Sequence, residues 1–293
     1  MTKSRCSRTF LASFVLCAFA LVASGWVAVA IAQETVVAVI ADYGVPGAPE
    51  ADVADLVRSW NPEAVLTAGD NCYAPGDYLS NVDPFYGEFV AEGVLFPAIG
   101  DHDRNDCGGL AAYEAYFNVP RYYEVVVGPV HAFLLNSEPD EPDGVTADSP
   151  QAEWLRLGLE QSTAPWKLVI LHHPPFSSGV EHGSHPHLQW PFAEWGASAV
   201  LSGDDHLYER LLVEGLPYFV VGLGGAVIHD FGEPLPESVV RYNADYGAMR
   251  LDASSESITF AFYTRTGELV DSYTLEAGMQ PQASLTEADS QAQ

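Results

Sequence analysis

The chain has 293 residues, of which 40 are acidic and 12 are basic, and its formal net charge at pH 7 is −28. A surface of this sign repels nucleic-acid backbones and anionic lipids, so neither is expected as a partner. An anionic small molecule would also be repelled unless the fold provided a local cationic centre, and few lysines and arginines are present to build one. With no Gly/Ser linker and no internal repeat, the length predicts one large domain.

The N-terminal segment, residues 1–32, has the features of an export signal. Basic residues precede an apolar stretch from Phe10 to Ala30, and Ala30-Ile31-Ala32 forms a small-x-small cleavage pattern. We therefore expect a signal peptide cleaved after Ala32, a secreted or periplasmic protein, and no stable membrane association of the mature chain. The alternative is an uncleaved membrane anchor, because the apolar stretch is long enough to span a bilayer.

The mature chain is predicted to form one domain over residues 33–277, followed by a polar, flexible tail over 278–293. The expected elements, in chain order, are strands at 35–40 and 64–68 with a helix at 49–60 between them, strands at 94–99 and 130–136, a helix at 151–161, strands at 167–171, 197–201 and 217–223, and short strands between 239 and 275. Strands alternating with helices before a β-rich final third predict an α/β fold in which helices cover the sheets.

Metal-ligating side chains follow several of the apolar strands. Asp42, Asp70, Asp101, His172 and His206 each come shortly after the end of a predicted strand. In open α/β sheets, ligands bind at the carboxyl ends of the strands. Any single aspartate here is explained as simply by a helix cap or a turn. Five strands that deliver carboxylates or imidazoles to one edge are harder to explain by packing, and they predict a functional site.

These residues belong to five sequence blocks: Asp42-x-Gly44; Gly69-Asp70-Asn71-Cys72-Tyr73; Gly100-Asp101-His102-Asp103; His172-His173-Pro174; and Gly203-Asp204-x-His206-x-Tyr208-Glu209-Arg210. In order and spacing they resemble the purple acid phosphatases, a branch of the calcineurin-like metallophosphoesterases. The blocks of that family are D-x-G, G-D-N-x-Y, G-N-H-D or G-N-H-E, a His shortly before Pro, and G-H-x-H, often followed by x-Y-E-R. The resemblance covers nearly the whole mature chain and implies a β-sandwich of two mixed sheets flanked by helices.

The resemblance also implies a centre of two metal ions. The residues at the positions of the first metal's ligands are Asp42, Asp70, Tyr73 and His206. Asp70 would bridge to the second metal, whose other ligands would be Asp101, His172 and Asp204. His102 matches a family acid that contacts the substrate, and His182 lies near a family substrate-binding histidine, so the resemblance implies catalytic roles for both.

Two of these residues depart from the family pattern, and both belong to the second metal. Asp101 replaces an asparagine, and Asp204 replaces the first histidine of G-H-x-H. Added carboxylates favour hard cations over zinc, so Mn, Mg, Fe and Zn are the candidates for the second site, with the hard cations preferred. Tyr73 favours iron at the first site, because a ferric ion would lower the pKa of the phenol far below its usual value near 10.

The predicted function is metal-dependent hydrolysis of small phosphate monoesters, by attack of a metal-activated water at the dinuclear centre. A phosphodiesterase with the same metals is one alternative, because the loops around His102, Arg104 and residues 181–187 carry no readable specificity. A metal- or phosphate-binding protein that has lost catalysis is another, because Asp101 and Asp204 alter the second site. The sequence does not indicate an oligomeric state.

The cysteines left after signal removal, Cys72 and Cys107, each lie in or just after one of the blocks. If the two loops converge, a disulfide is reasonable in an oxidising compartment; otherwise both thiols are free. The remaining histidines receive plainer interpretations. His173 either lines the site or caps a loop, His185 and His187 are candidates for substrate contact, and His131 and His229 are expected to be structural.

Overall fold

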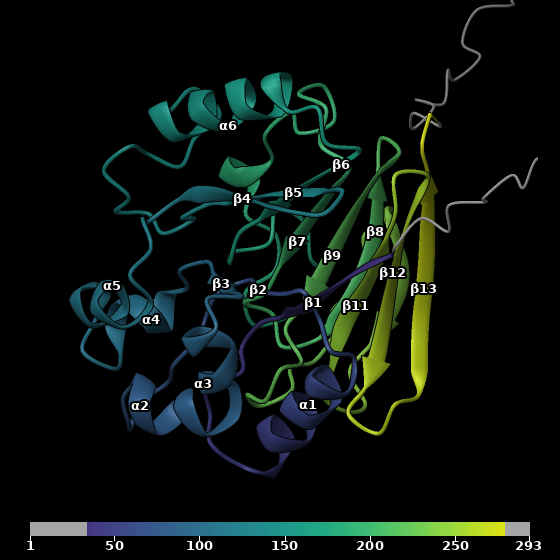
Figure 1. Ribbon diagram of the computed structural model, residues 1–293. Helices are drawn as coiled ribbons and strands as arrows, with labels where there is room; N and C mark the ends of the chain where they lie inside the picture. The colour runs from purple at the N-terminus through teal and green to yellow at the C-terminus, as the bar shows by residue number, and fades with distance from the viewer. Residues whose placement is uncertain (1–33, 279–293) are drawn as a thin grey trace, which may run out of the picture. The chain divides into compact units, whose positions relative to one another are not determined.

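The computed structural model describes residues 34–278, so the predicted signal peptide and all of the predicted tail except Gly278 lie outside the described residues. Within them, two mixed β-sheets pack face to face (Figure 1). The six-stranded sheet has the order β13 (Leu269–Glu276), β12 (Ser257–Thr264), β11 (Gly247–Ala253), β1 (Thr35–Ile40), β2 (Ala64–Thr67) and β3 (Leu95–Pro97). The seven-stranded sheet has the order β10 (Ser238–Tyr242), β8 (Tyr208–Val213), β9 (Leu216–Val221), β7 (Ala199–Ser202), β6 (Trp166–Ile170), β5 (Val130–Leu134) and β4 (Tyr123–Val127).

Helices cover the outer faces of both sheets (Figure 1). Those that pack on the six-stranded sheet are α1 (Ala48–Ser59), α2 (Tyr78–Asn81), α3 (Asp83–Ala91) and α5 (Leu110–Phe117). The seven-stranded sheet is covered by α6 (Pro150–Gln161) and the short 3-10 helix η1 (Pro186–Leu188). The short helix α4 (Asp101–Asn105) follows β3. The predicted class, two mixed sheets flanked by helices, is confirmed. In the described part of the chain, no helix is both long enough and apolar enough to cross a membrane.

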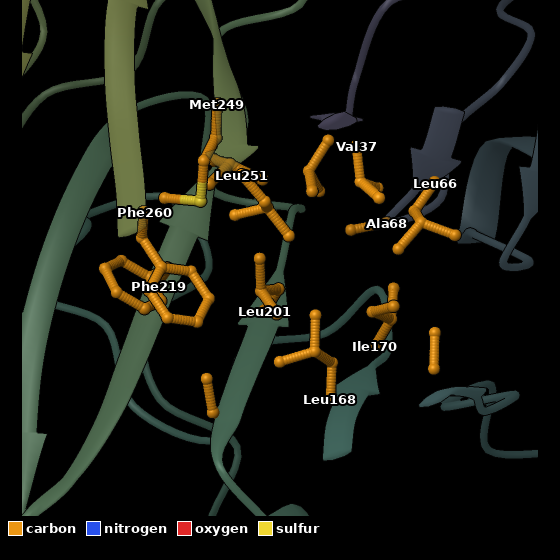
Figure 2. Close-up of a cluster of buried hydrophobic side chains, with 14 of the residues drawn as sticks. Val37, Leu66, Ala68, Leu168, Ile170, Leu201, Phe219, Met249, Leu251 and Phe260 are labelled. Carbon is orange, nitrogen blue, oxygen red and sulfur yellow. The ribbon is translucent and has the colours of Figure 1, made fainter. Parts of the chain in front are cut away.

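In strand β1, every residue after Thr35 is apolar, and its surroundings explain why. Val37 and Val39 point into the layer between the sheets, whereas Ala38 and Ile40 pack with the helices, and all four are fully buried. A strand covered on both faces has no position left for a polar side chain, so its sequence reads as a continuous apolar run. Figure 2 shows the layer between the sheets, in which side chains such as Val37 and Leu168 meet.

The observed ends of the predicted strands and of the two long helices lie within two residues of their expected positions. The sequence did not predict β4, β8 or the helices α2 to α5. Helices α2 and α4 have four and five residues, which is too short to show a helical period. Strand β4 lies at a sheet edge and has no fully buried residue, and its apolar run, residues 125–127, is short.

Parallel strand pairs bring the predicted site residues to one place. Strands β1 and β2 run parallel in one sheet, and β6 and β7 run parallel in the other. Asp42, Asp70, His172 and Asp204 follow the carboxyl ends of these four strands. The backbone N–H of Asp204 donates to both carboxylate oxygens of Asp42 at 3.2 Å, which joins the two sheets at this edge. The fold therefore assembles the site where the edges of both sheets meet.

Candidate metal centre

Three aspartates of the centre have an unusual backbone conformation. The φ angles of Asp42, Asp70 and Asp204 are 56°, 52° and 69°, in the left-handed region that residues with a side chain rarely adopt. Each residue follows a buried strand, so the chain turns sharply at the end of the sheet. Such conformations persist only where the surrounding structure imposes them, and they are concentrated at functional sites.

The first donor group consists of Asp42, Tyr73 and His206. Tyr73 Oη lies 3.3 Å from Asp42 Oδ1 and 3.2 Å from His206 Nε2, and His206 Nε2 lies 3.4 Å from Asp42 Oδ1. The three atoms therefore form a nearly equilateral triangle. Metal–ligand bonds of about 2.1 Å at usual coordination angles separate two ligand atoms by about 3.0–3.4 Å. The spacing of this group fits three donors around one ion.

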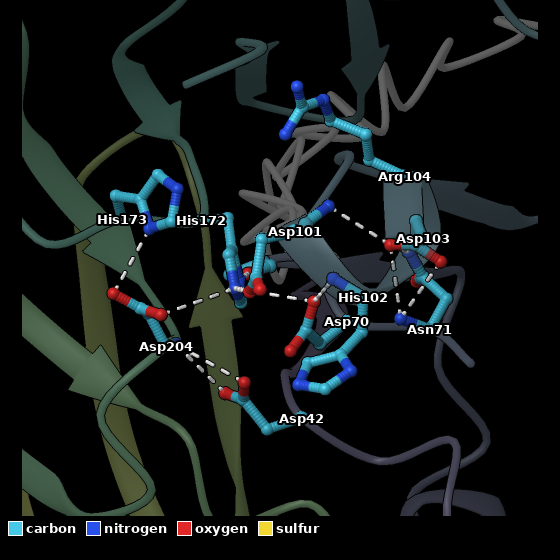
Figure 3. Close-up of polar contacts among 12 residues, drawn as sticks. Asp42, Asp70, Asn71, Asp101, His102, Asp103, Arg104, His172, His173 and Asp204 are labelled. Carbon is cyan, nitrogen blue, oxygen red and sulfur yellow. Dashed lines mark hydrogen bonds and ion pairs between the residues drawn. The ribbon is translucent and has the colours of Figure 1, made fainter. Parts of the chain in front are cut away.

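The second donor group consists of Asp101, His172 and Asp204. His172 Nε2 lies 3.3 Å from Asp101 Oδ1 and 3.7 Å from Asp204 Oδ1. Asp70 lies beside both groups, because its Oδ1 is 3.3 Å from His172 Nε2 and its carboxylate also clusters with Asp42. Figure 3 shows the carboxylates gathered around His172. The structure thus brings all seven predicted metal-ligand residues together.

Backbone carbonyls fix the two imidazoles of the centre. His172 Nδ1 donates to the carbonyl of Ala68 at 2.9 Å, and His206 Nδ1 donates to the carbonyl of Val227 at 2.7 Å. Because a carbonyl oxygen only accepts, Nδ1 carries a proton in both rings, and Nε2 is the ring nitrogen that faces the carboxylates. This arrangement is the usual preparation of a histidine for metal binding.

The charges of the centre call for a cation. The side chains of Asp42, Asp70 and Asp204 are at most 2% exposed, and among the described residues no lysine or arginine forms an ion pair with them. Burying several carboxylates with only histidines beside them is costly. Burial raises the pKa of Asp70 to about 7, and the charges of Asp42 and Asp101 add to the rise, which outweighs the lowering by His172. Oxygen and imidazole donors around a buried negative charge fit one or two metal ions.

Two glycines of the sequence blocks leave the space that these donors occupy. A Cβ atom at Gly69, where φ is 90°, would lie 2.4 Å from His172 Nδ1. A Cβ atom at Gly100 would lie 2.2 Å from Asp70 Oδ1. Any side chain at either position would displace a donor, so the glycines have a steric role in the centre.

The two predicted catalytic histidines lie at the accessible side of the centre. The backbone N–H of His102 donates to Asp70 Oδ1 at 2.9 Å, and its ring packs on Tyr73 with 4.1 Å between the ring centroids. His182 Nδ1 lies 3.5 Å from Asp204 Oδ1. The two side chains are 40% and 41% exposed, so one histidine beside each donor group can reach a molecule that enters from solvent.

His173 lies behind the second donor group, where it contacts a donor of the site instead of only capping a loop. Its Nδ1 is 3.0 Å from Asp204 Oδ2, and its Nε2 is 3.1 Å from Glu138 Oε1. Burial lowers the pKa of His173, but hydrogen bonds to these two carboxylates outweigh it and raise the pKa to about 9. An imidazolium therefore offsets part of the charge of Asp204. His185 packs on His173, 4.7 Å away, and not on the donors.

Sequence reasoning missed two supporting residues. Asp205 accepts hydrogen bonds from the Ser177 hydroxyl and from the backbone N–H of His182, so it holds the loop that carries His182. His229 was expected to be merely structural, but its ring stacks on His206 with centroids 3.9 Å apart, and its Nδ1 accepts the His206 N–H at 3.1 Å. The doubled Asp204-Asp205 in the last block was a sequence signal for Asp205. No sequence signal marks His229.

Cys72 and Cys107 form a disulfide, with 6.3 Å between their Cα atoms. Cys72 lies in the loop after β2, which also carries Tyr73. Cys107 lies just after α4, the helix that carries His102. The two loops converge, and the interpretation of a disulfide is confirmed over that of two free thiols.

Two mixed sheets with carboxylates and imidazoles gathered at the strand ends define a metallophosphoesterase-type protein. A family model described as calcineurin-like phosphoesterase matches residues 35–208, and the chain belongs to this family. The Fe(3+)-Zn(2+) purple acid phosphatase 12 of Arabidopsis thaliana is 24% identical over 255 residues, which cover 69% of this chain and 53% of the relative. The "Probable inactive purple acid phosphatase 1" of the same plant is 24% identical over 267 residues, 73% of this chain and 43% of the relative. The chain thus spans about half the length of these curated relatives, and the resemblance to purple acid phosphatases is confirmed.

Solved structures share the fold. The purple acid phosphatase PPD1 from seeds of yellow lupin (Lupinus luteus) aligns with a TM-score of 0.70 and 19% identity, over 84% of this chain and 54% of that one. GAP50, the anchor in the inner membrane complex of Plasmodium, aligns with a TM-score of 0.68 and 15% identity, over 84% of this chain and 90% of that one. At these identities the likeness shows the fold alone.

Proposed function

We propose that this chain is an exported phosphatase that hydrolyses small phosphate monoesters at a centre of two metal ions. The observation that carries the proposal is the place of Asp70, beside two donor groups whose atoms are spaced 3.2–3.7 Å apart. A carboxylate shared by two ions is a natural bridge in dinuclear hydrolases. We propose iron on the side of Tyr73, and Mn, Mg, Fe or Zn on the side of Asp101 and Asp204. Bound there, the ions would neutralise the phosphate and supply a nucleophilic water.

His102 is the proposed acid. Hydrolysis joins the oxygen of water to phosphorus and breaks the P–O bond to the alcohol, whose oxygen then takes up a proton. Burial lowers the pKa of His102, but the charge of Asp70 and the hydrogen bond to Asp106 outweigh it and raise the pKa above its ordinary value. Nδ1 of His102 is held by Asp106 Oδ2 at 2.6 Å, which leaves Nε2 to give its proton to the departing alcohol. His182, beside Asp204, is proposed to contact a phosphate oxygen.

Charge and cysteine chemistry support the proposals of export and of small substrates. The Cys72–Cys107 disulfide supports an oxidising compartment, in which such bonds persist. This agrees with the proposed signal peptide at residues 1–32, although that segment lies outside the described residues. The net charge of −28 disfavours nucleic acids and anionic membranes as substrates.

The test is a metal analysis of the purified protein combined with assays of p-nitrophenyl phosphate and bis(p-nitrophenyl) phosphate. We expect two metal equivalents per chain and faster hydrolysis of the monoester. His102→Ala should keep both metals and lower turnover. His131→Ala is the matched control and should leave turnover unchanged. His131 lies on the outer face of β5, where its ring bonds to the Ser162 hydroxyl. Faster hydrolysis of the diester would favour the phosphodiesterase alternative.

A second candidate is a protein that binds metal and phosphate without hydrolysing the ester. Asp101 and Asp204 favour it, because each places a carboxylate where the family has a neutral side chain, and one relative is named as inactive. Added negative charge strengthens cation binding but repels the substrate phosphate and lowers the Lewis acidity of the ion. A protein that holds two metals and binds phosphate, yet hydrolyses neither ester, would support this candidate.

A further inference from the structure

An apolar pocket adjoins the first donor group. It has a volume of about 450 Å³ and is lined by Val45, Pro46, Tyr73, Ala74, Pro75, His206, Ala226 and Val227. Tyr73 and His206 form its wall toward the metal centre, and the other lining side chains are aliphatic. None of the described residues that line the pocket is acidic, although the chain has 40 acidic residues. A volume of this size is typical of sites for small molecules.

The pocket is built on the loops of the metal centre. Val45 follows Asp42, Ala74 follows Tyr73, and Val227 lies in the loop after β9. The backbone N–H of Ala226 donates to the carbonyl of Asp42 at 2.9 Å, which ties this last loop to the centre. Val45 and Val227 are nevertheless 36% and 77% exposed. An apolar hollow that opens to solvent beside a few polar groups has the character of a small-molecule site.

We propose that this pocket binds the alcohol part of the phosphate ester and selects esters of apolar, uncharged alcohols such as benzyl alcohol. The inference rests on the proposed phosphatase function. Because the ring of His102 packs on Tyr73, an ester oxygen that takes its proton from His102 lies at the rim of the pocket, and the carbon atoms beyond it extend over Tyr73. An anionic leaving group would find no lysine or arginine among the described residues that line the pocket.

The first arm of the test compares benzyl phosphate with 2-hydroxyethyl phosphate, two monoesters of primary alcohols that carry the same phosphate charge. We expect the wild-type kcat/KM to favour the benzyl ester by at least about tenfold, and the double variant Val45→Ser/Val227→Ser to reduce that ratio by about fivefold to tenfold. Val126→Ser is the matched control, because Val126 is 62% exposed on β4, outside the pocket, and should leave the ratio unchanged. Equal ratios in the wild type and the double variant would overturn the proposal.

The second arm does not depend on turnover. Dissociation constants of benzylphosphonate and 2-hydroxyethylphosphonate are measured by calorimetry on protein loaded with Mn²⁺. We expect the benzyl compound to bind at least about fivefold tighter to the wild type and to lose that advantage in the double variant. Selective binding without hydrolysis would refute the phosphatase function but support the pocket. Hydrolysis without selectivity, equal affinities, or no binding of either phosphonate would refute the pocket.

Discussion

The two donor groups of the candidate metal centre differ in charge and in what supports them. The first has a single carboxylate, Asp42, and its imidazole is held by the carbonyl of Val227 and by stacking on the ring of His229. The second has two carboxylates, and behind Asp204 stands the imidazolium of His173. The family has a histidine at the position of Asp204. Here an imidazole, that of His173, lies behind Asp204 instead. A centre can therefore exchange a ligand's charge and keep its fold if the surrounding layer compensates.

The largest effect is expected where the two groups meet. Asp70→Ala should remove both metal ions and lower kcat on p-nitrophenyl phosphate by at least about a thousandfold, since it withdraws the shared carboxylate. Metal content and kcat are measured on the same preparation. Asp55→Ala, which removes an exposed carboxylate on α1, is the control. Retention of one full metal equivalent with Asp70→Ala would show that the two groups bind independently.

The disulfide ties the loop after β2, with Tyr73 of the first group, to the segment after α4, the helix with Asp101 of the second. Removing this bond should cause the largest change in stability. It closes a loop with a sequence separation of 35, so reduction should lower the free energy of unfolding by roughly 3–4 kcal/mol in the chain-entropy model. Urea unfolding of the Cys72→Ser/Cys107→Ser variant measures the loss. An unchanged unfolding midpoint would mean that the metal centre alone holds the two segments.

On helix α1, Glu50 is fully buried, and neither of its carboxyl oxygens has a hydrogen-bond partner among the described residues. Burial raises its pKa to about 9. Between pH 4.5 and 9 the folded state then binds more protons than the unfolded state, so Glu50 lowers the stability as the pH rises. Glu50→Gln should add roughly 2–4 kcal/mol at pH 7.5 and nothing at pH 4. Urea unfolding at both pH values tests this, and an equal effect at both would refute the assigned pKa.

Converting the second group to the family pattern should have a smaller effect on rate than on metal choice. Asp101→Asn with Asp204→His removes two negative charges and adds a softer donor. We expect the double variant to prefer zinc or ferrous iron over Mn²⁺ and to hydrolyse p-nitrophenyl phosphate by up to about tenfold faster, because the phosphate meets less repulsion. Activities of the metal-stripped protein after addition of each metal provide the measurement. An unaltered metal preference would place Asp101 and Asp204 outside the coordination shell.

The parts of the centre that follow strands could be predicted from the sequence. Asp42 and His172 come directly after apolar runs, and the sheet itself determines where such residues gather. The support of the centre could not be predicted in the same way. His173 reaches Glu138, 35 positions earlier in the chain, and His229 meets His206 through a loop that returns after β9. These contacts depend on how loops pack in three dimensions, and no local period or motif encodes them.

The most direct test of the account counts metal ions in the wild-type protein. Protein stripped with a chelator is equilibrated with excess Mn²⁺, freed of unbound metal and analysed for metal per chain. The account predicts two equivalents, because the two donor groups each present an imidazole and at least one carboxylate and share Asp70. One equivalent at saturating Mn²⁺ would contradict it and would leave the carboxylates of Asp101 and Asp204 without the ion that we propose they hold.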